Sequence, residues 1–170
     1  GEFIFFWNEP LYGYYGGEDE WVIRRHGELL AAAGVDVIIF DSSNLSLVWT
    51  KSFDAIAKVW SQMRKEGTKT PSMSYLLNFG ACEYTRDDLY TFYDWFQTKP
   101  LAREMWFHWK GKPLVLGYPG SLKPGDGHIL DTFTFRPCQP SYFHGAERGA
   151  KWGWLSIYPQ KVFPGEDGSP

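Results

Sequence analysis

The first half of the chain alternates between short apolar runs and longer segments whose apolar residues recur at three- and four-residue spacing. The short runs predict buried strands at residues 3–7, 35–40 and 72–77. The longer segments predict amphipathic helices at residues 19–33 and 52–66, because residues at this spacing lie on one face of a helix. Strands that alternate with helices are typical of a parallel α/β fold.

The same alternation continues beyond the third strand. Residues 85–88, Thr-Arg-Asp-Asp, resemble a capping box with Asp in place of Glu, and predict a third helix that ends near Gln97. A short helical piece is expected at residues 101–109, followed by a fourth strand at residues 114–118.

The chain becomes less regular after Pro119, where the pattern predicts no further helix. Strands are expected at residues 129–135 and 154–158. We therefore predict one domain over residues 1–170, with a less regular C-terminal segment at residues 120–170.

The helix of residues 19–33 has a defined apolar face and a clear stop. The residues expected on that face are Val22, His26, Leu29, Leu30 and Ala33. Gly34 and Gly67 are expected to end the first two helices, since glycine readily adopts the left-handed conformation found after helices. His26 is interpreted as a core histidine, because it lies on the apolar face.

Two architectures fit this pattern: an open doubly wound sheet and a (β/α)8 barrel. A complete barrel needs about 250 residues, and the chain has 170. We therefore predict an α/β fold that is a partial or truncated (β/α)8 TIM-like barrel with parallel strands. Such a barrel leaves an open edge strand, which favours self-association.

Composition and charge exclude several partners. Aromatic residues make up 19% of the chain, and the net charge is -3. Because the chain has no excess of basic residues, it lacks the positive charge that binding to nucleic acid requires. The sequence contains no apolar run of about 18 residues, so we expect no membrane partner. No charged segment followed by an apolar run opens the chain, so we expect no signal peptide within these residues.

The chain has few candidates for metal ligands. Its two cysteines, Cys82 and Cys138, are too few for a disulfide-dense scaffold or a four-cysteine zinc site. Both follow predicted strands, so a disulfide between them and two free thiols both stay open. His108, His128 and His144 lack metal-ligand spacing. We expect no metal and no cofactor.

Acidic, polar and aromatic residues gather where the predicted strands end, which is where parallel α/β folds place their functional residues. Glu9, Asp41 and Glu83 are the candidate catalytic residues, because glycoside hydrolysis uses one carboxyl group as acid and a second as nucleophile or base. The candidate sugar-binding residues are Trp7, Asn8, Tyr12, Tyr15, Asn44, Asn78, Tyr118 and Arg136. Aromatic rings stack on pyranose rings and polar groups bind hydroxyls, so the predicted partner is a carbohydrate substrate.

Each of these candidates also has a purely structural interpretation. Asn8 and Glu9 can simply end a strand before Pro10. Asp41 can cap backbone amides of the loop that follows it. Glu83 can be a solvated loop charge, and Arg136 can be a buried ion-pair partner.

Three segments of the chain carry a family resemblance. Residues 14–26 (YYGGEDEWVIRRH) and 33–41 (AGVDVIIFD) resemble the opening units of (β/α)8 glycoside hydrolases of families 71 and 99. Residues 111–115 (GKPLV) resemble the segment that leads into a later strand of those families. The resemblance covers residues 3–120 and implies a carbohydrate-active barrel, secreted or periplasmic, that acts on a poly- or oligosaccharide.

The chain departs from the family 99 pattern at two places. Residues 41–43 are Asp-Ser-Ser where that family has aromatic residues. The paired catalytic glutamates of family 99 lie on later strands in a W-x-E-x-x-E-like context, which this sequence lacks. An acid and base beyond Pro170 therefore stay open as an alternative to the candidates named above.

A second, shorter resemblance concerns the first candidate acid. Residues 8–10, Asn-Glu-Pro, are similar to the acid/base tripeptide of cellulase-type barrels, which would make Glu9 the proton donor. A nucleophilic glutamate should then end a strand three units later, but Tyr118 or Arg136 stands there.

Three classes of function stay open. The leading hypothesis is a glycoside hydrolase, and the second is a non-catalytic carbohydrate-binding or structural α/β domain, including an inactive fragment of a hydrolase. The third is a doubly wound domain that binds a small anion near Gly16 and Gly17. Two strand-end carboxyl groups about 5–10 Å apart would favour hydrolysis, whereas carboxyl groups engaged in ion pairs or caps would favour binding alone.

Overall fold

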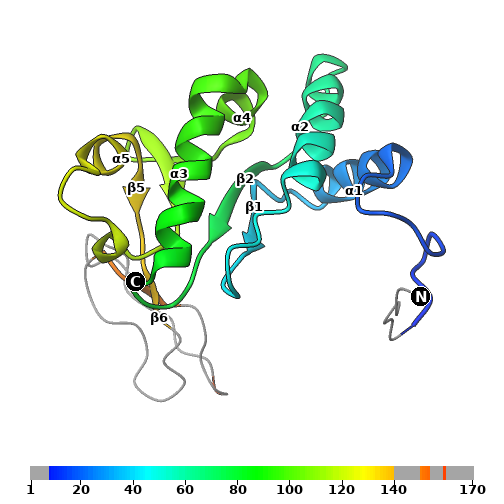
Figure 1. The fold of residues 1–170 in the computed structure, drawn as a ribbon. Helices are drawn as coiled ribbons and strands as arrows, with labels where there is room; N and C mark the ends of the chain where they lie inside the picture. The colour runs from blue at the N-terminus through cyan, green and yellow to red at the C-terminus, as the bar shows by residue number, and fades with distance from the viewer. Residues whose placement is uncertain (1–7, 140–149, 154–158, 160–170) are drawn as a thin grey trace. The chain divides into compact units, whose positions relative to one another are not determined.

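A computed structural model describes residues 8–139, 150–153 and 159 of the chain (Figure 1). The strands expected at residues 3–7 and 154–158 lie outside the described residues, and so does Trp7.

The chain divides into two compact units, each of which is discontinuous in sequence. Unit 1 comprises Gly1–Val35 and Trp49–Pro71, and unit 2 comprises Asp36–Val48 and Ser72–Pro170.

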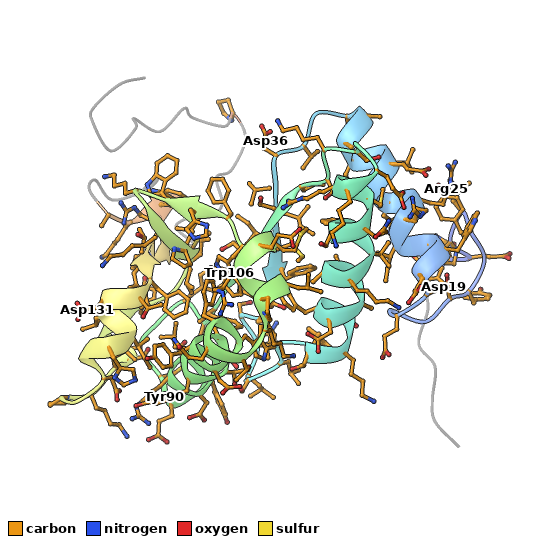
Figure 2. All side chains as sticks on the ribbon, turned by 90° about the horizontal axis from the view of Figure 1, so that it is seen from above. Asp19, Arg25, Asp36, Tyr90, Trp106 and Asp131 are labelled. Atoms are coloured by element: carbon orange, nitrogen blue, oxygen red, sulfur yellow. The ribbon has the colours of Figure 1, made fainter. Side chains whose placement is uncertain are left out.

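Unit 1 contains the two helices that the sequence predicts. Helix α1 spans Glu20–Ala32 and helix α2 spans Thr50–Lys65. Asp19 caps α1 by accepting a hydrogen bond of 3.0 Å from the backbone N–H of Val22, and Figure 2 shows it at the start of this helix. Gly34 follows α1 with a φ of +74°, which confirms the predicted left-handed stop.

The two helices of unit 1 pack closely at Gly27. A Cβ atom at Gly27 would lie 2.7 Å from Nε1 of Trp60, so only glycine permits this approach. The same Trp60 nitrogen donates a hydrogen bond of 3.1 Å to the carbonyl of Ile23. This contact places Ile23 and Gly27 on the buried face of α1. The prediction that Leu29 faces the core is wrong, because its side chain is 50% exposed.

Unit 2 is built around parallel strands that follow one another in chain order. Strand β1 (Val37–Asp41) pairs in parallel with β2 (Ser72–Leu76), with Val37 opposite Ser72. A parallel bridge between Leu76 and Leu116 joins β2 to the chain just after β4 (Lys112–Val115). The next pairing, β4 with β5 (Thr134–Phe135), is also parallel. The predicted alternation of parallel strands and helices is therefore confirmed, and the strands within the described residues form no closed barrel.

A hairpin precedes the fourth predicted strand. Strand β3 (His108–Trp109) runs antiparallel to β4. Lys110 and Gly111 connect them with φ values of +53° and +82°, as a two-residue turn between antiparallel strands requires. The helical piece expected at residues 101–109 is thus partly wrong: helix α4 spans only Pro100–Met105, because the chain has to leave the helix to form the hairpin.

Helix α3 begins earlier than the capping-box pattern predicts. It spans Glu83–Thr98 and follows Cys82, so Thr85 lies inside its first turn rather than at its cap. The Thr85 hydroxyl is buried and donates a hydrogen bond of 3.4 Å to Oδ1 of Asn78. The Thr85 hydroxyl therefore bonds to the residue that follows β2 by two positions, and it does not cap the backbone of α3.

The expectation of no helix after Pro119 is wrong, and the strand expected at residues 129–135 is confirmed only at its end, as β5 (Thr134–Phe135). A 3-10 turn spans Pro119–Ser121, and helix α5 spans Gly127–Thr132. Ile129 is fully buried whereas Leu130 is exposed, and the N–H of Phe133 donates to the carbonyl of Ile129. This short helix buries one side chain per turn, which accommodates the apolar residues of the segment without the alternating burial that a strand would show.

Two further short strands lie near the C-terminal end of the described residues. Strand β6 spans Cys138–Gln139 and pairs in parallel with β7, which spans Trp152–Gly153.

Helices α3 and α4 cover one face of the unit 2 sheet through aromatic contacts. The ring of Tyr75 on β2 lies 4.7 Å from Phe92 and 5.6 Å from Trp106, measured between centroids, and Figure 2 labels Trp106 amid these side chains. The opposite face carries a separate apolar cluster. Its buried members are Leu76, Leu114, Leu116 and Cys138.

Candidate functional site

Four of the predicted site residues lie at the carboxyl ends of neighbouring strands of unit 2. Asp41 is the last residue of β1, and strand alternation places its side chain on the same face as Ile39, a member of the cluster opposite α3 and α4. Asn78 lies two residues after β2, and Tyr118 lies three residues after β4. Arg136 directly follows β5. We call Asp41, Asn78, Tyr118 and Arg136 the carboxyl-edge residues.

The strand register brings these residues to the same edge. Asp41 lies opposite Leu76, and Leu76 lies opposite Leu116. On the next strand, the N–H of Arg136 donates to the carbonyl of Val115 at 3.0 Å. Three strand spacings separate Asp41 from Arg136, or roughly 14 Å. A short oligosaccharide has this length.

Side chains beyond the strand ends tie neighbouring loops together. Nδ2 of Asn78 donates a hydrogen bond of 2.6 Å to the carbonyl of Ser43, which follows β1. The Tyr118 hydroxyl donates to the carbonyl of Cys138 at 3.4 Å. These contacts hold the two side chains in place and leave part of each exposed.

Asp41 combines solvent exposure with a backbone contact. Its Oδ1 accepts a hydrogen bond of 2.9 Å from the N–H of Ser43, as in the capping role that the sequence left open. Asn44 lies exposed in the same loop.

Arg136 is buried at the other end of this edge. Its Nη1 donates to the carbonyl of Phe135 at 2.7 Å, and its guanidinium lies 6.0 Å from the ring centroid of Trp152. The side chain is only 8% exposed, so a ligand would meet it at its outer surface.

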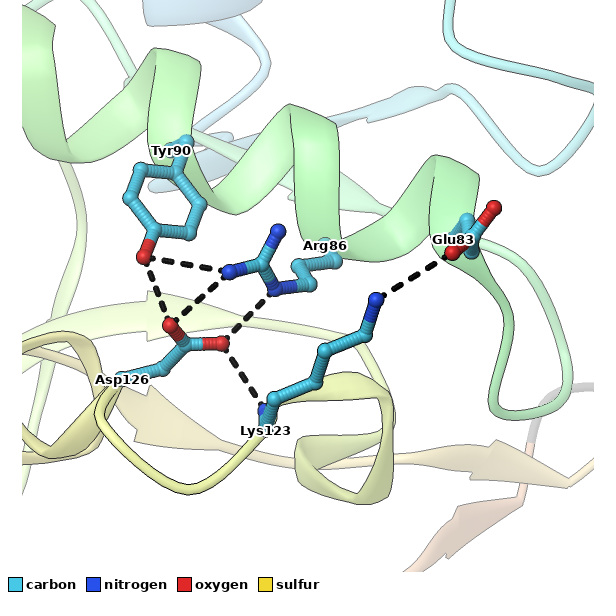
Figure 3. Close-up of polar contacts among 5 residues, drawn as sticks. All are labelled: Glu83, Arg86, Tyr90, Lys123 and Asp126. Atoms are coloured by element: carbon cyan, nitrogen blue, oxygen red, sulfur yellow. Dashed lines mark hydrogen bonds and ion pairs between the residues drawn. The ribbon is translucent and has the colours of Figure 1, made fainter.

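Glu83 lies apart from these residues. It starts α3 and forms an exposed ion pair of 3.2 Å with Nζ of Lys123 (Figure 3). Its side chain is 84% exposed, which matches the solvated loop charge that was the alternative interpretation.

The remaining candidates belong to unit 1. Asn8 and Glu9 are exposed. Tyr12 contacts Trp21 edge-on with ring centroids 5.3 Å apart, and Tyr15 contacts His26 in the same way at 6.0 Å. The half-buried His26 is therefore packed between aromatic rings.

The anion site considered near Gly16 and Gly17 finds no support in unit 1. The helix that follows these glycines begins with Asp19 and Glu20, whose negative charges oppose an anion at the helix N-terminus. A Cβ at Gly17 would lie 3.0 Å from Oγ of Ser52, so packing against a side chain explains the glycine.

One buried acid was not recognised as a site candidate from the sequence. Asp88 on α3 is fully buried, and its Oδ1 accepts a hydrogen bond of 2.6 Å from the Ser46 hydroxyl. Burial raises the pKa of Asp88 to about 6, the Ser46 hydrogen bond lowers it and the charge of Asp87 raises it further. The signal in the sequence was its position: Asp88 lies one turn after Thr85 and one turn before Phe92, on the apolar face of the helix.

A second buried acid, Asp126, stabilises the fold (Figure 3). Arg86 donates to both of its carboxylate oxygens, at 2.8 and 3.0 Å, and the Tyr90 hydroxyl donates to one of them at 2.6 Å. The backbone N–H of Lys123 donates to the other at 2.8 Å. The Arg86 guanidinium, followed by the other two donors, holds the pKa of Asp126 far below its usual range. With its oxygens engaged, this carboxylate links α3 to the segment before α5.

Cys82 and Cys138 are both free thiols. Burial raises the pKa of Cys138 to about 12, so the group is uncharged at neutral pH. The described residues contain no group of three or more His, Cys, Asp or Glu side chains that could hold a metal ion. In the same part of the chain, none of the helices has the length and apolar composition needed to cross a bilayer.

Comparisons with protein-family models, with curated proteins and with solved structures find no match to this chain.

Proposed function

We propose that the chain is part of a (β/α)8-barrel-type glycoside hydrolase and that it binds a poly- or oligosaccharide along the carboxyl-edge residues. The observation that carries the proposal is the placement of Asp41, Asn78, Tyr118 and Arg136 at one edge of a parallel sheet. In parallel α/β folds this edge is where ligands bind.

The strand order supports a barrel rather than a doubly wound sheet. In unit 2, β1 lies beside β2, β2 beside the continuation of β4, and β4 beside β5. A doubly wound sheet reverses its order at a switch point, and the described parallel strands show no such reversal. A barrel adds each new strand beside the previous one, as these strands do.

The chemistry of the edge suits a sugar. Asp41 accepts hydrogen bonds, Asn78 both donates and accepts, and Arg136 donates. Tyr118 adds an aromatic face with a polar tip, which suits the mixed apolar and polar surface of a pyranose.

Hydrolysis would require a second carboxyl group near Asp41. Glu83 is already paired with Lys123, and Glu9 belongs to unit 1, so the contributions of Glu9 and Asp41 to hydrolysis are tested separately. In this proposal the enzyme acts outside the cytoplasm, where polysaccharides are found.

A glycan-binding screen with the full chain tests the proposal. The wild-type chain should bind at least one class of oligosaccharide, and Asp41→Asn should weaken binding without changing the far-UV circular dichroism spectrum. Asp131→Asn, at an exposed acid on α5, is the matched control and should bind normally. Equal binding by wild type and Asp41→Asn would contradict the proposed site.

A second candidate function is carbohydrate binding without hydrolysis. It is favoured by the engagement of two predicted catalytic acids, Asp41 with the Ser43 amide and Glu83 with Lys123. Release of reducing sugar from a bound oligosaccharide distinguishes the two functions. A chain that hydrolyses its ligand should lose this activity in Glu9→Gln or Asp41→Asn, whereas a binding module releases no sugar at all.

An open sheet edge supports a further partner. A partial barrel leaves a strand whose unpaired backbone groups can pair with a strand of a second copy. We propose self-association through such an edge, which should appear as a concentration-dependent increase in mass in analytical ultracentrifugation.

A further inference from the structure

The Asp88 carboxyl group has an unusual environment for an acid. Its side chain is fully buried, and only Oδ1 has a partner, the Ser46 hydroxyl at 2.6 Å. Oδ2 is buried with no hydrogen-bond partner among the described residues. A buried carboxylate with a free oxygen is costly, so this group needs an explanation beyond packing.

Ser46 belongs to the loop that follows β1, which we call the 42–48 loop. Other side chains of unit 2 hold this loop at both ends. Nδ2 of Asn78 donates to the Ser43 carbonyl at 2.6 Å, and the Tyr75 hydroxyl donates to the Val48 carbonyl at 3.0 Å. Between these two attachments, Ser46 connects the middle of the loop to Asp88.

The loop needs such attachments because its backbone is strained. Leu45 has a φ of +62°, a conformation that is unfavourable for a residue with a Cβ atom. Its side chain is 56% exposed, so packing of Leu45 itself gives little compensation. Contacts from outside the loop must hold this conformation in place.

We propose that Asp88 is a positioning residue, which holds the 42–48 loop against α3 through Ser46 and thereby places the loop beside Asp41 at the candidate sugar site. The part of this inference that concerns sugar rests on the proposed function. The part that concerns the loop stands on the contacts of unit 2 alone.

The charge state of Asp88 should control how firmly the loop is held. The ionisable neighbour that acts on it from α3 is Asp87, which also disfavours the charged form. The 42–48 loop contains no ionisable side chain, and the Tyr75 phenol on β2 is engaged with Val48. The one cation of α3, Arg86, is engaged by Asp126, and neither the 42–48 loop nor β2 contains a cation. Ionisation should therefore favour an open loop in which water reaches Oδ2.

Amide hydrogen exchange of the full chain, read as protection factors for residues 42–48, tests the proposal without any sugar. The closed-loop pKa is raised to about 6 from the ordinary value of 3.8, so protection should be about tenfold lower at pH 7.5 than at pH 5. Asp88→Asn should remove this dependence on pH. Asp87→Asn, one residue away and exposed, is the control and should keep it.

Two results would overturn the proposal: protection in the wild type that does not change with pH, or a pH dependence that survives in Asp88→Asn. Ser46→Ala provides a second route if Asp88→Asn fails to fold. It should lower protection of the loop at both pH values, and protection equal to the wild type would overturn the proposal.

The same samples separate this inference from the proposed function. If the loop responds to pH as expected but the chain binds no glycan at pH 5 or 7.5, the proposed function fails and the positioning role of Asp88 stands. If the chain binds glycan but the protection of residues 42–48 does not change with pH, the positioning role fails and the carboxyl-edge proposal stands.

Discussion

Gly27 on α1 and Trp60 on α2 touch so closely that a methyl group on the glycine would lie 2.7 Å from the indole nitrogen. That nitrogen is also engaged with the Ile23 carbonyl, so Trp60 cannot move aside without breaking a buried hydrogen bond. The contact fixes how the two helices of unit 1 pack.

Gly27→Ala should therefore destabilise the chain, although alanine is the better helix former. Overpacking of this kind costs about 1–3 kcal/mol, which outweighs the helix propensity gain of about 1 kcal/mol. Urea unfolding followed by tryptophan fluorescence measures the change. The control is Gly127→Ala at the start of α5, where a Cβ meets nothing within 4 Å; it should leave the free energy of unfolding unchanged or raise it.

Asp126→Asn should destabilise unit 2 at neutral pH, because the variant loses charge-assisted hydrogen bonds from Arg86. The pKa of Asp126 is lowered in the folded chain, so its stabilisation is present above the ordinary value of 3.8 and is lost as the pH falls below it. The wild type should thus lose stability below about pH 4 through this group, and the variant should lack that component. Denaturant midpoints from pH 7 to pH 2.5 measure both effects; the same acid response in the two proteins would contradict this role.

The sequence predicted the repeating part of the fold better than its irregular connections. Apolar spacing found α1, α2, β1 and β2, because each buries one face or one short run. It failed at residues 129–132, where the apolar pattern predicts a strand but the chain forms the short helix α5 and buries Ile129. Tertiary contacts decided that segment, since Asp126 is held by Arg86, 40 positions earlier in the chain.

The site shows the same division. The ends of the predicted strands were sufficient to nominate Asp41, Asn78, Tyr118 and Arg136, because short apolar runs show where a strand stops. The contacts between loops were not predictable, since Ser46 meets Asp88 42 positions later. The role of Glu83 depended on Lys123, 40 positions later, for the same reason.

Gly111→Ala should weaken the β3–β4 hairpin. Gly111 has a φ of +82°, and a side chain in this conformation costs about 1–2 kcal/mol. Lys110→Asn is the informative comparison, because asparagine tolerates the left-handed conformation that Lys110 adopts at +53°. Thermal unfolding should show a lower midpoint for the glycine variant and an unchanged or higher midpoint for the asparagine variant.

Asn78→Asp should affect both stability and glycan binding. The change removes the donor to the Ser43 carbonyl and places a carboxylate oxygen beside it, at a cost of about 1–3 kcal/mol. Loss of this hydrogen bond should also weaken oligosaccharide binding, measured by titrating the variant and the wild type with the same oligosaccharide. Asn44→Asp, an identical change at an exposed position, should have little effect on stability; an equal loss in both variants would show that added charge, rather than the lost tie, is responsible.

The division of the chain into two discontinuous units has a practical consequence for dissecting it. The polypeptide passes from one unit to the other after Val35, after Val48 and after Pro71, so the segments of the two units alternate along the sequence. A truncation that starts at Ser72 would strip β2 of its neighbour β1, and one that stops at Pro71 would leave β1 without β2. Neither half is expected to behave as an autonomous folding unit, and circular permutation is a better tool than deletion for asking which piece carries the ligand.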